Sequence, residues 1–105
     1  MSECTISFVT CGSAEEAAKL AEALVTEKLA ACVNIVPGVT SVYFWEGKLC
    51  RESEHLLVVK STAAAQERLA RRVKELHSYA VPEVVTFPIA SGNPDYLRWV
   101  ESSIR

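Results

Sequence analysis

The chain has 105 residues, of which 50% are hydrophobic and 23% are charged, and its formal net charge is −2. This size and balance are those of one globular domain, so they argue against a second domain, a disordered chain or a membrane-spanning protein. The small net charge also argues against a broad nucleic-acid surface, because phosphate binding needs a concentrated excess of lysine and arginine. We therefore expect residues 1–105 to form one domain that binds neither nucleic acid nor membrane.

The cysteines and the first residues bear on the compartment. None of the four cysteines forms a Cys-x-x-Cys pair, so zinc-knuckle and thioredoxin-type spacings are absent. The first ten residues contain no basic segment followed by a long apolar run, which is the pattern of a secretory signal. We expect a cytoplasmic protein with reduced thiols.

The first two elements are predicted to be a strand and a helix. Residues 5–11 alternate and are mostly β-branched or aromatic, which predicts a strand that is buried on at least one face. Ser13 precedes Glu16 by three residues, which is the capping-box spacing at a helix start. A single apolar stripe then predicts a helix that ends near Leu29. The stripe consists of Ala17, Leu20, Ala21 and Leu24.

Residues 31–60 predict a long β-hairpin that turns at residues 45–48. Each arm has roughly a dozen residues, against a usual strand of about 5 to 6. Pro37-Gly38 places the first arm at a sheet edge or predicts a bulge there, and the apolar run at 56–59 predicts a central strand. The outer hairpin faces are too apolar to remain in water, so we expect the hairpin to be an assembly element. These apolar residues are Val39, Val42, Tyr43, Phe44, Trp45 and Leu49.

The second half predicts two further helices and an edge strand. We expect Ser61 or Thr62 to cap the second helix. Residues 77–82 predict a loop, because the residue before a proline is pushed out of the helical region. Residues 84–89 predict a short edge strand, and Asn93 begins a closing helix. The inward-facing residues are expected to be Leu69, Val73 and Leu76 in the second helix and Leu97, Val100 and Ile104 in the third.

The predicted order is therefore βαββαβ with a C-terminal helix. An α+β, ferredoxin-like split βαβ sandwich satisfies it, with two helices on one face of an antiparallel four-stranded sheet. The other sheet face would be apolar and bare, so we expect a closed cyclic homo-oligomer.

The chain contains no recognisable cofactor or hydrolase motif. Polar residues near element ends are candidates to meet at one end of the sheet: Cys11, Cys32, Asn34, Lys60, His77, Tyr79 and Glu83. Cys11 is either a soft-metal ligand or a packed thiol, and His77 is either a ligand or a residue that interacts with a helix C-terminus. His55 is expected on the strand surface. An enzyme with Cys11 or Cys32 as nucleophile would need a nearby base and a lowered thiol pKa, and we expect no enzyme.

Several separate runs resemble the CutA family of divalent-cation tolerance proteins. They are residues 28–34 and 36–41, Tyr43 with 45–48, Tyr79 with Pro82-Glu83, and Gly92-Asn93 with Tyr96-Leu97 and Trp99. The resemblance implies a ferredoxin-like subunit in a tight homotrimer. It also implies a role in metal tolerance, with copper as the expected ion and zinc or another divalent cation as the alternative.

The resemblance also implies ligands. The copper ligands proposed for bacterial relatives fall here on Cys11, Leu76 and His77, so one histidine is replaced by leucine, and Ser78 stands where proline is usual. The leading hypothesis is a copper-binding homotrimer that uses Cys11 and His77.

The second hypothesis is a trimeric small-molecule sensor like the PII signalling proteins, which rests on fold analogy. Its ligand would lie in a cleft between subunits, lined by Cys32, Trp45, Lys60, Tyr79 and Glu83.

Overall fold

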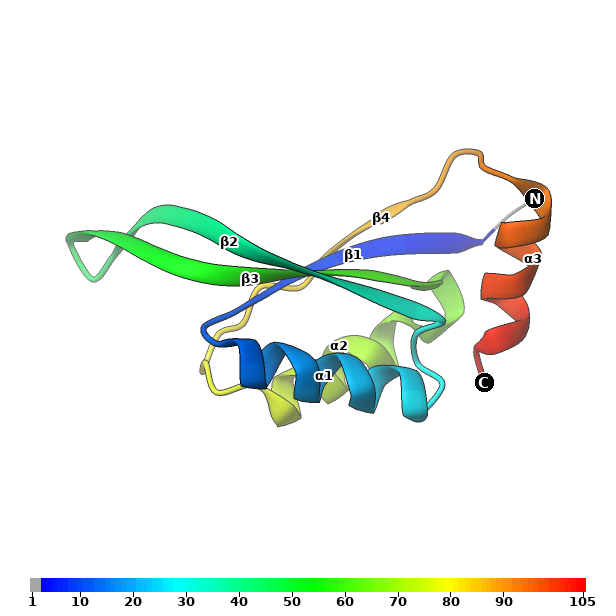
Figure 1. Ribbon diagram of the computed structural model, residues 1–105, viewed down its shortest axis with the longest axis horizontal. Coiled ribbons are helices and arrows are strands. Elements are labelled where there is room, and N and C mark those ends of the chain that lie inside the picture. Colours follow the sequence, from blue (N-terminus) through cyan, green and yellow to red (C-terminus); the bar gives the residue numbers. More distant parts are fainter. Residues whose placement is uncertain (1–2) are drawn as a thin grey trace.

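The computed structural model describes residues 3–105 (Figure 1). Its elements follow the predicted order. They are β1 (Cys4–Cys11), α1 (Ala14–Thr26), β2 (Cys32–Trp45), β3 (Lys48–Thr62), a short 3-10 turn η1 (Ala63–Ala65), α2 (Gln66–Leu76), β4 (Val85–Pro88) and α3 (Pro94–Ser103).

The sheet has the strand order β2-β3-β1-β4, and all neighbouring strands are antiparallel. This order is that of a split βαβ sandwich, so the predicted α+β class and sheet topology are confirmed. Figure 1 shows α1 and α2 on the same side of the sheet and α3 at one end of it. No helix within residues 3–105 is long and apolar enough to cross a membrane.

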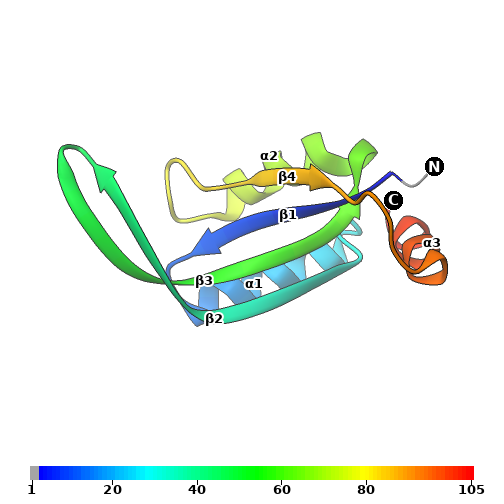
Figure 2. The same cartoon turned by 90° about the horizontal axis from the view of Figure 1, so that it is seen from above.

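The β2–β3 hairpin extends well past β1 and β4, as Figure 2 shows, and the molecule measures 44 × 25 × 22 Å. Glu46 and Gly47 form its tight turn with φ angles of 50° and 79°, the positive values that favour glycine in such turns. The pairing register shifts between Val36 and Val39, so Pro37-Gly38 forms the predicted irregularity in an edge strand. The long hairpin is therefore confirmed.

The helix starts agree only partly with the predictions. Ser13 Oγ accepts a hydrogen bond from the Glu16 backbone N–H at 3.1 Å, as expected for α1. The prediction that Ser61 or Thr62 caps the second helix is wrong, because both residues belong to β3 and pair with β1. Ser61 Oγ instead donates to the Leu29 carbonyl at 2.6 Å. The helix α2 begins only after η1, at Gln66, without a side-chain cap.

The main core lies between the sheet and the two helices. Its large, fully buried side chains are Val9, Leu20, Leu24, Leu57, Val59, Leu69 and Val73. A second, smaller cluster of Cys4, Ala31 and Val100 packs with α3. The predicted inward faces of all three helices are thus confirmed by buried residues.

The opposite sheet face is apolar and largely uncovered, and we call it the open face. Strand alternation and register place on it Ile6, Phe8, Val36, Leu56, Val58, Val85 and Phe87. Phe8 and Phe87 make an edge-to-face contact with ring centres 5.2 Å apart, while Val85 remains 49% exposed. Figure 1 shows α3 at one end of the sheet. Toward the other end, the loop that contains Tyr79 and Glu83 bonds to Glu54 and Thr10, which alternation places on this face. One chain therefore leaves an apolar surface in water.

Candidate functional site

Cys11 ends β1 and faces the core, where it is fully buried. Burial, followed by the negative charges of Glu16 and Glu54, raises the pKa of its thiol to about 11. The thiol is thus protonated at neutral pH, whereas a catalytic cysteine needs a lowered pKa. The same two carboxylates create a negative potential that favours a cation at this position.

His77 follows α2 directly, and its side chain is fully buried. Its Nε2 lies 2.7 Å from the Thr10 carbonyl oxygen, and its Nδ1 accepts the Tyr79 backbone N–H at 3.0 Å. These partners assign a neutral ring with its proton on Nε2, although Glu16 Oε2 lies only 3.5 Å from Nδ1. Both ring nitrogens are therefore engaged, and one hydrogen bond must open before His77 binds a cation.

Glu16 joins the start of α1 to the loop after α2. Its carboxylate accepts the Ser78 backbone N–H at 2.7 Å and the Ser78 hydroxyl at 3.1 Å. Partial burial raises the pKa of Glu16, but the hydrogen bonds from Ser78 outweigh this effect, so the pKa is lowered overall. The carboxylate thus stabilises the loop that holds His77.

Glu16→Gln is expected to reduce the free energy of unfolding by about 1 kcal/mol at neutral pH, because the hydrogen bonds lose their charged acceptor. A lowered folded-state pKa contributes stability that is present above the unfolded pKa and is lost as the pH falls through the folded value. Urea unfolding measured from neutral to acid pH should therefore show a shallower acid loss in the variant. Equal slopes for both proteins would contradict this role of Glu16.

A hollow of about 700 Å³ lies between the hairpin and the loop that contains Tyr79. Its aromatic and acidic lining includes Tyr43, Trp45, Glu54, Tyr79 and Glu83. The Tyr79 hydroxyl donates to Glu54 Oε2 at 2.7 Å, and burial together with this bond raises the pKa of Tyr79. Three of the predicted cleft residues, Trp45, Tyr79 and Glu83, thus meet in one chain. The sequence analysis did not include Glu54 among the candidates, although it is only 6% exposed and accepts this bond from Tyr79.

Cys32 and Lys60 lie elsewhere. They are direct partners in the β2–β3 register, with Lys60 Nζ 3.9 Å from Cys32 Sγ and also bonded to Asn34 Oδ1. Because the hairpin is antiparallel, the start of β2 meets the end of β3, which is beside the opposite end of β1 from Cys11. One chain therefore does not bring all the candidate residues to one end of the sheet.

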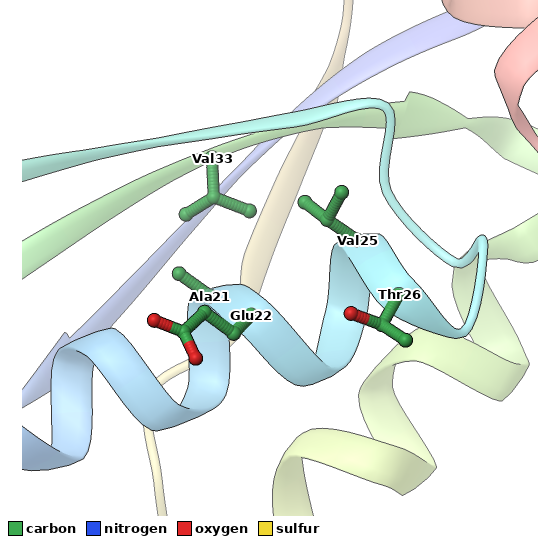
Figure 3. A pocket seen from close by; sticks show the side chains of 5 residues that line it. All are labelled: Ala21, Glu22, Val25, Thr26 and Val33. Atoms are coloured by element: carbon green, nitrogen blue, oxygen red, sulfur yellow. The ribbon is translucent and has the colours of Figure 1, made fainter.

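A smaller hollow of about 370 Å³ lies between α1 and β2. Figure 3 shows Val33 pointing toward Ala21 and Val25, while Glu22 is the only carboxylate in the lining. This surface offers no cysteine or histidine. Among residues 3–105, no group of three His, Cys, Asp or Glu side chains is arranged to hold a metal ion. Cys11, Cys32 and Cys50 are free thiols.

Comparison with known proteins identifies similar chains. The family described as CutA1 divalent ion tolerance protein matches residues 5–103. The divalent-cation tolerance protein CutA of Thermus thermophilus is 51% identical over 98 residues, which cover 93% of this chain and 95% of that protein. The chloroplastic Protein CutA 1 of Oryza sativa is 46% identical over 95% of this chain, which spans only 56% of the rice protein. The solved T. thermophilus structure superposes with a TM-score of 0.95 at 49% identity, covering 97% of this chain and 99% of that one.

Proposed function

The chain belongs to the CutA1 divalent ion tolerance family, and we propose that it acts in metal-ion tolerance as a homotrimer that binds copper-type cations. The observation that carries this proposal is the family match over residues 5–103. Zinc or another divalent cation is the alternative cargo. The family and the relatives described above are CutA proteins and not PII-type sensors.

The open face and the hairpin support assembly. A small domain rarely leaves a continuous apolar sheet face in water, and the hairpin tip adds exposed Phe44 and Leu49. Identical chains that cover each other's open faces with closed symmetry would bury both surfaces. The number three follows from the resemblance of the hairpin and edge-strand sequences to the family.

The proposed cation site is at the Cys11 end of the sheet. A deprotonated thiol suits copper and zinc, and Glu16 and Glu54 add negative charge around it. His77 is the second candidate ligand, provided that its bond to Thr10 or to Tyr79 opens. Because one chain offers no group of three ligands within residues 3–105, an ion with higher coordination needs donors from a neighbouring subunit. The free thiols of Cys11, Cys32 and Cys50 favour a cytoplasmic location.

Replacing Cys11 by alanine tests this site. We expect copper affinity, measured by competition with a chromophoric chelator, to fall at least about 10-fold, because loss of even an outer-shell partner has an effect of that size. Cys50→Ala is the matched control, since Cys50 lies in the hairpin, where its thiol donates to the Lys48 carbonyl at 3.7 Å. Circular dichroism verifies that both variants fold. Unchanged copper affinity in the Cys11 variant would remove this residue from the site.

A further inference from the structure

His55 contains a buried nitrogen that has no hydrogen-bond partner. Within residues 3–105, its Nδ1 is the buried side-chain nitrogen or oxygen for which no protein partner is found. An unsatisfied buried polar atom is costly, and such atoms are uncommon in native proteins unless they serve a purpose. The sequence placed His55 on the strand surface, and this buried Nδ1 differs from that expectation.

The sheet places His55 beside Cys11. The two residues are direct partners in the β1–β3 register. His55 alternates with Leu57 and Val59, which face the core, and Cys11 faces the same core. Side chains of such a pair start from Cβ atoms about 4.5 to 5.5 Å apart. The imidazole and the thiol therefore share one face of the sheet at one level.

The hairpin irregularity lies on the other side of His55. The β2–β3 register passes from Val36↔Leu56 to Val39↔Glu54, so Pro37 and Gly38 together lie opposite His55 in a bulge. His55 as a residue is only partly buried, although its Nδ1 is buried. His77, by contrast, has both ring nitrogens bonded within the chain.

A thiolate and an imidazole form a soft donor pair. Two such ligands suffice for Cu(I), which is stable with a coordination number of two, whereas Zn(II) takes four ligands in structural sites. The absence of any group of three potential ligands within residues 3–105 fits an ion of low coordination number. Glu16 and Glu54 supply negative charge near Cys11 without having to coordinate.

We propose that Cys11 and His55 together bind one Cu(I) ion per chain. On binding, the thiol of Cys11 releases its proton to solvent and its sulfur binds the ion. His55 donates the Nδ1 lone pair while its ring proton stays on Nε2. This inference deepens the proposed function, because it assigns the imidazole ligand and the oxidation state of the copper.

The test is an anaerobic Cu(I) titration of the full chain against a chromophoric Cu(I) chelator. His55→Ala is expected to lower the Cu(I) affinity at least about 10-fold, similar to the loss in Cys11→Ala. Cys50→Ala is the control, because Cys50 lies farther out in the hairpin, paired with Tyr43, and this variant should bind Cu(I) as the unmodified protein does. Zn(II) in equal amount should not displace the Cu(I).

The outcomes separate the two proposals. If Cys11→Ala loses Cu(I) but His55→Ala does not, the His55 assignment is overturned while the Cys11 site stands. If neither variant loses Cu(I), the proposed site fails as well. X-ray absorption of the loaded protein provides a second readout, with one sulfur and one nitrogen neighbour expected around the copper. A copper ion bound by sulfur alone would overturn the assignment of His55.

Discussion

Replacing Val85 by aspartate is expected to dissociate the assembly into monomers. Val85 lies on the edge strand β4, opposite Phe8 on the open face, and is 49% exposed in the single chain. A monomer would tolerate a carboxylate there. A trimer that covers this face would have to bury an unpaired charge, which costs several kcal/mol. About 3 kcal/mol corresponds to a dissociation constant raised at least 100-fold, which sedimentation equilibrium would detect.

Val25→Asp provides the matched control for this experiment. Val25 is 42% exposed, but it lies on α1, on the helix-covered side of the sheet (Figures 1 and 3). The same substitution there adds the same charge at a similar exposure without touching the open face. We expect this variant to sediment as the unmodified protein does. A Val85 variant that also keeps its assembly would show that the open face is not the interface.

His77→Ala is expected to lower the free energy of unfolding by about 2 to 5 kcal/mol. The substitution leaves the Thr10 carbonyl and the Tyr79 N–H without their buried partner, and each unsatisfied group costs about 1 to 3 kcal/mol. It also removes a ring contact with Tyr79, whose centre lies 4.6 Å from that of His77. Urea unfolding at fixed chain concentration measures the change, since assembly makes apparent stability concentration-dependent.

His55→Ala is the comparison for this loss. The buried Nδ1 of His55 has no hydrogen-bond partner, so the substitution leaves no other group unsatisfied. We therefore expect the free energy of unfolding to change by less than about 1 kcal/mol without copper. The two histidines would then differ in role, with His77 stabilising the fold and His55 binding copper. Equal losses of stability in the two variants would contradict that division.

Local sequence patterns predicted most of the fold because the residues that start, end or bend each element lie close together in the sequence. Ser13 before Glu16 marks the start of α1, and Pro37-Gly38 marks the irregularity in β2. The cap expected at Ser61 or Thr62 failed because the pairing of β3 with β1, which is not local, extends the strand through both residues. A capping residue type alone does not reveal whether a neighbouring strand competes for its backbone.

The candidate site was predictable only in part. Cys11 and His77 were expected among the residues that could meet at one sheet end, and His77 is bonded there to the carbonyl of Thr10, the residue before Cys11. Within one chain, Cys32 and Lys60 lie away from the other candidates, and antiparallel pairing of the predicted hairpin arms already implied this separation. The burial of Glu54 and of His55 Nδ1 depends on how distant segments pack around the hairpin. No sequence spacing encodes that packing.

A crystal structure of the copper-loaded protein, with diffraction data recorded at the copper absorption edge, tests cation binding by the assembled protein most directly. We expect three chains related by a threefold axis and one anomalous peak beside Sγ of each Cys11. Copper peaks found only at other positions, in any assembly, would contradict a cation site at this end of the sheet.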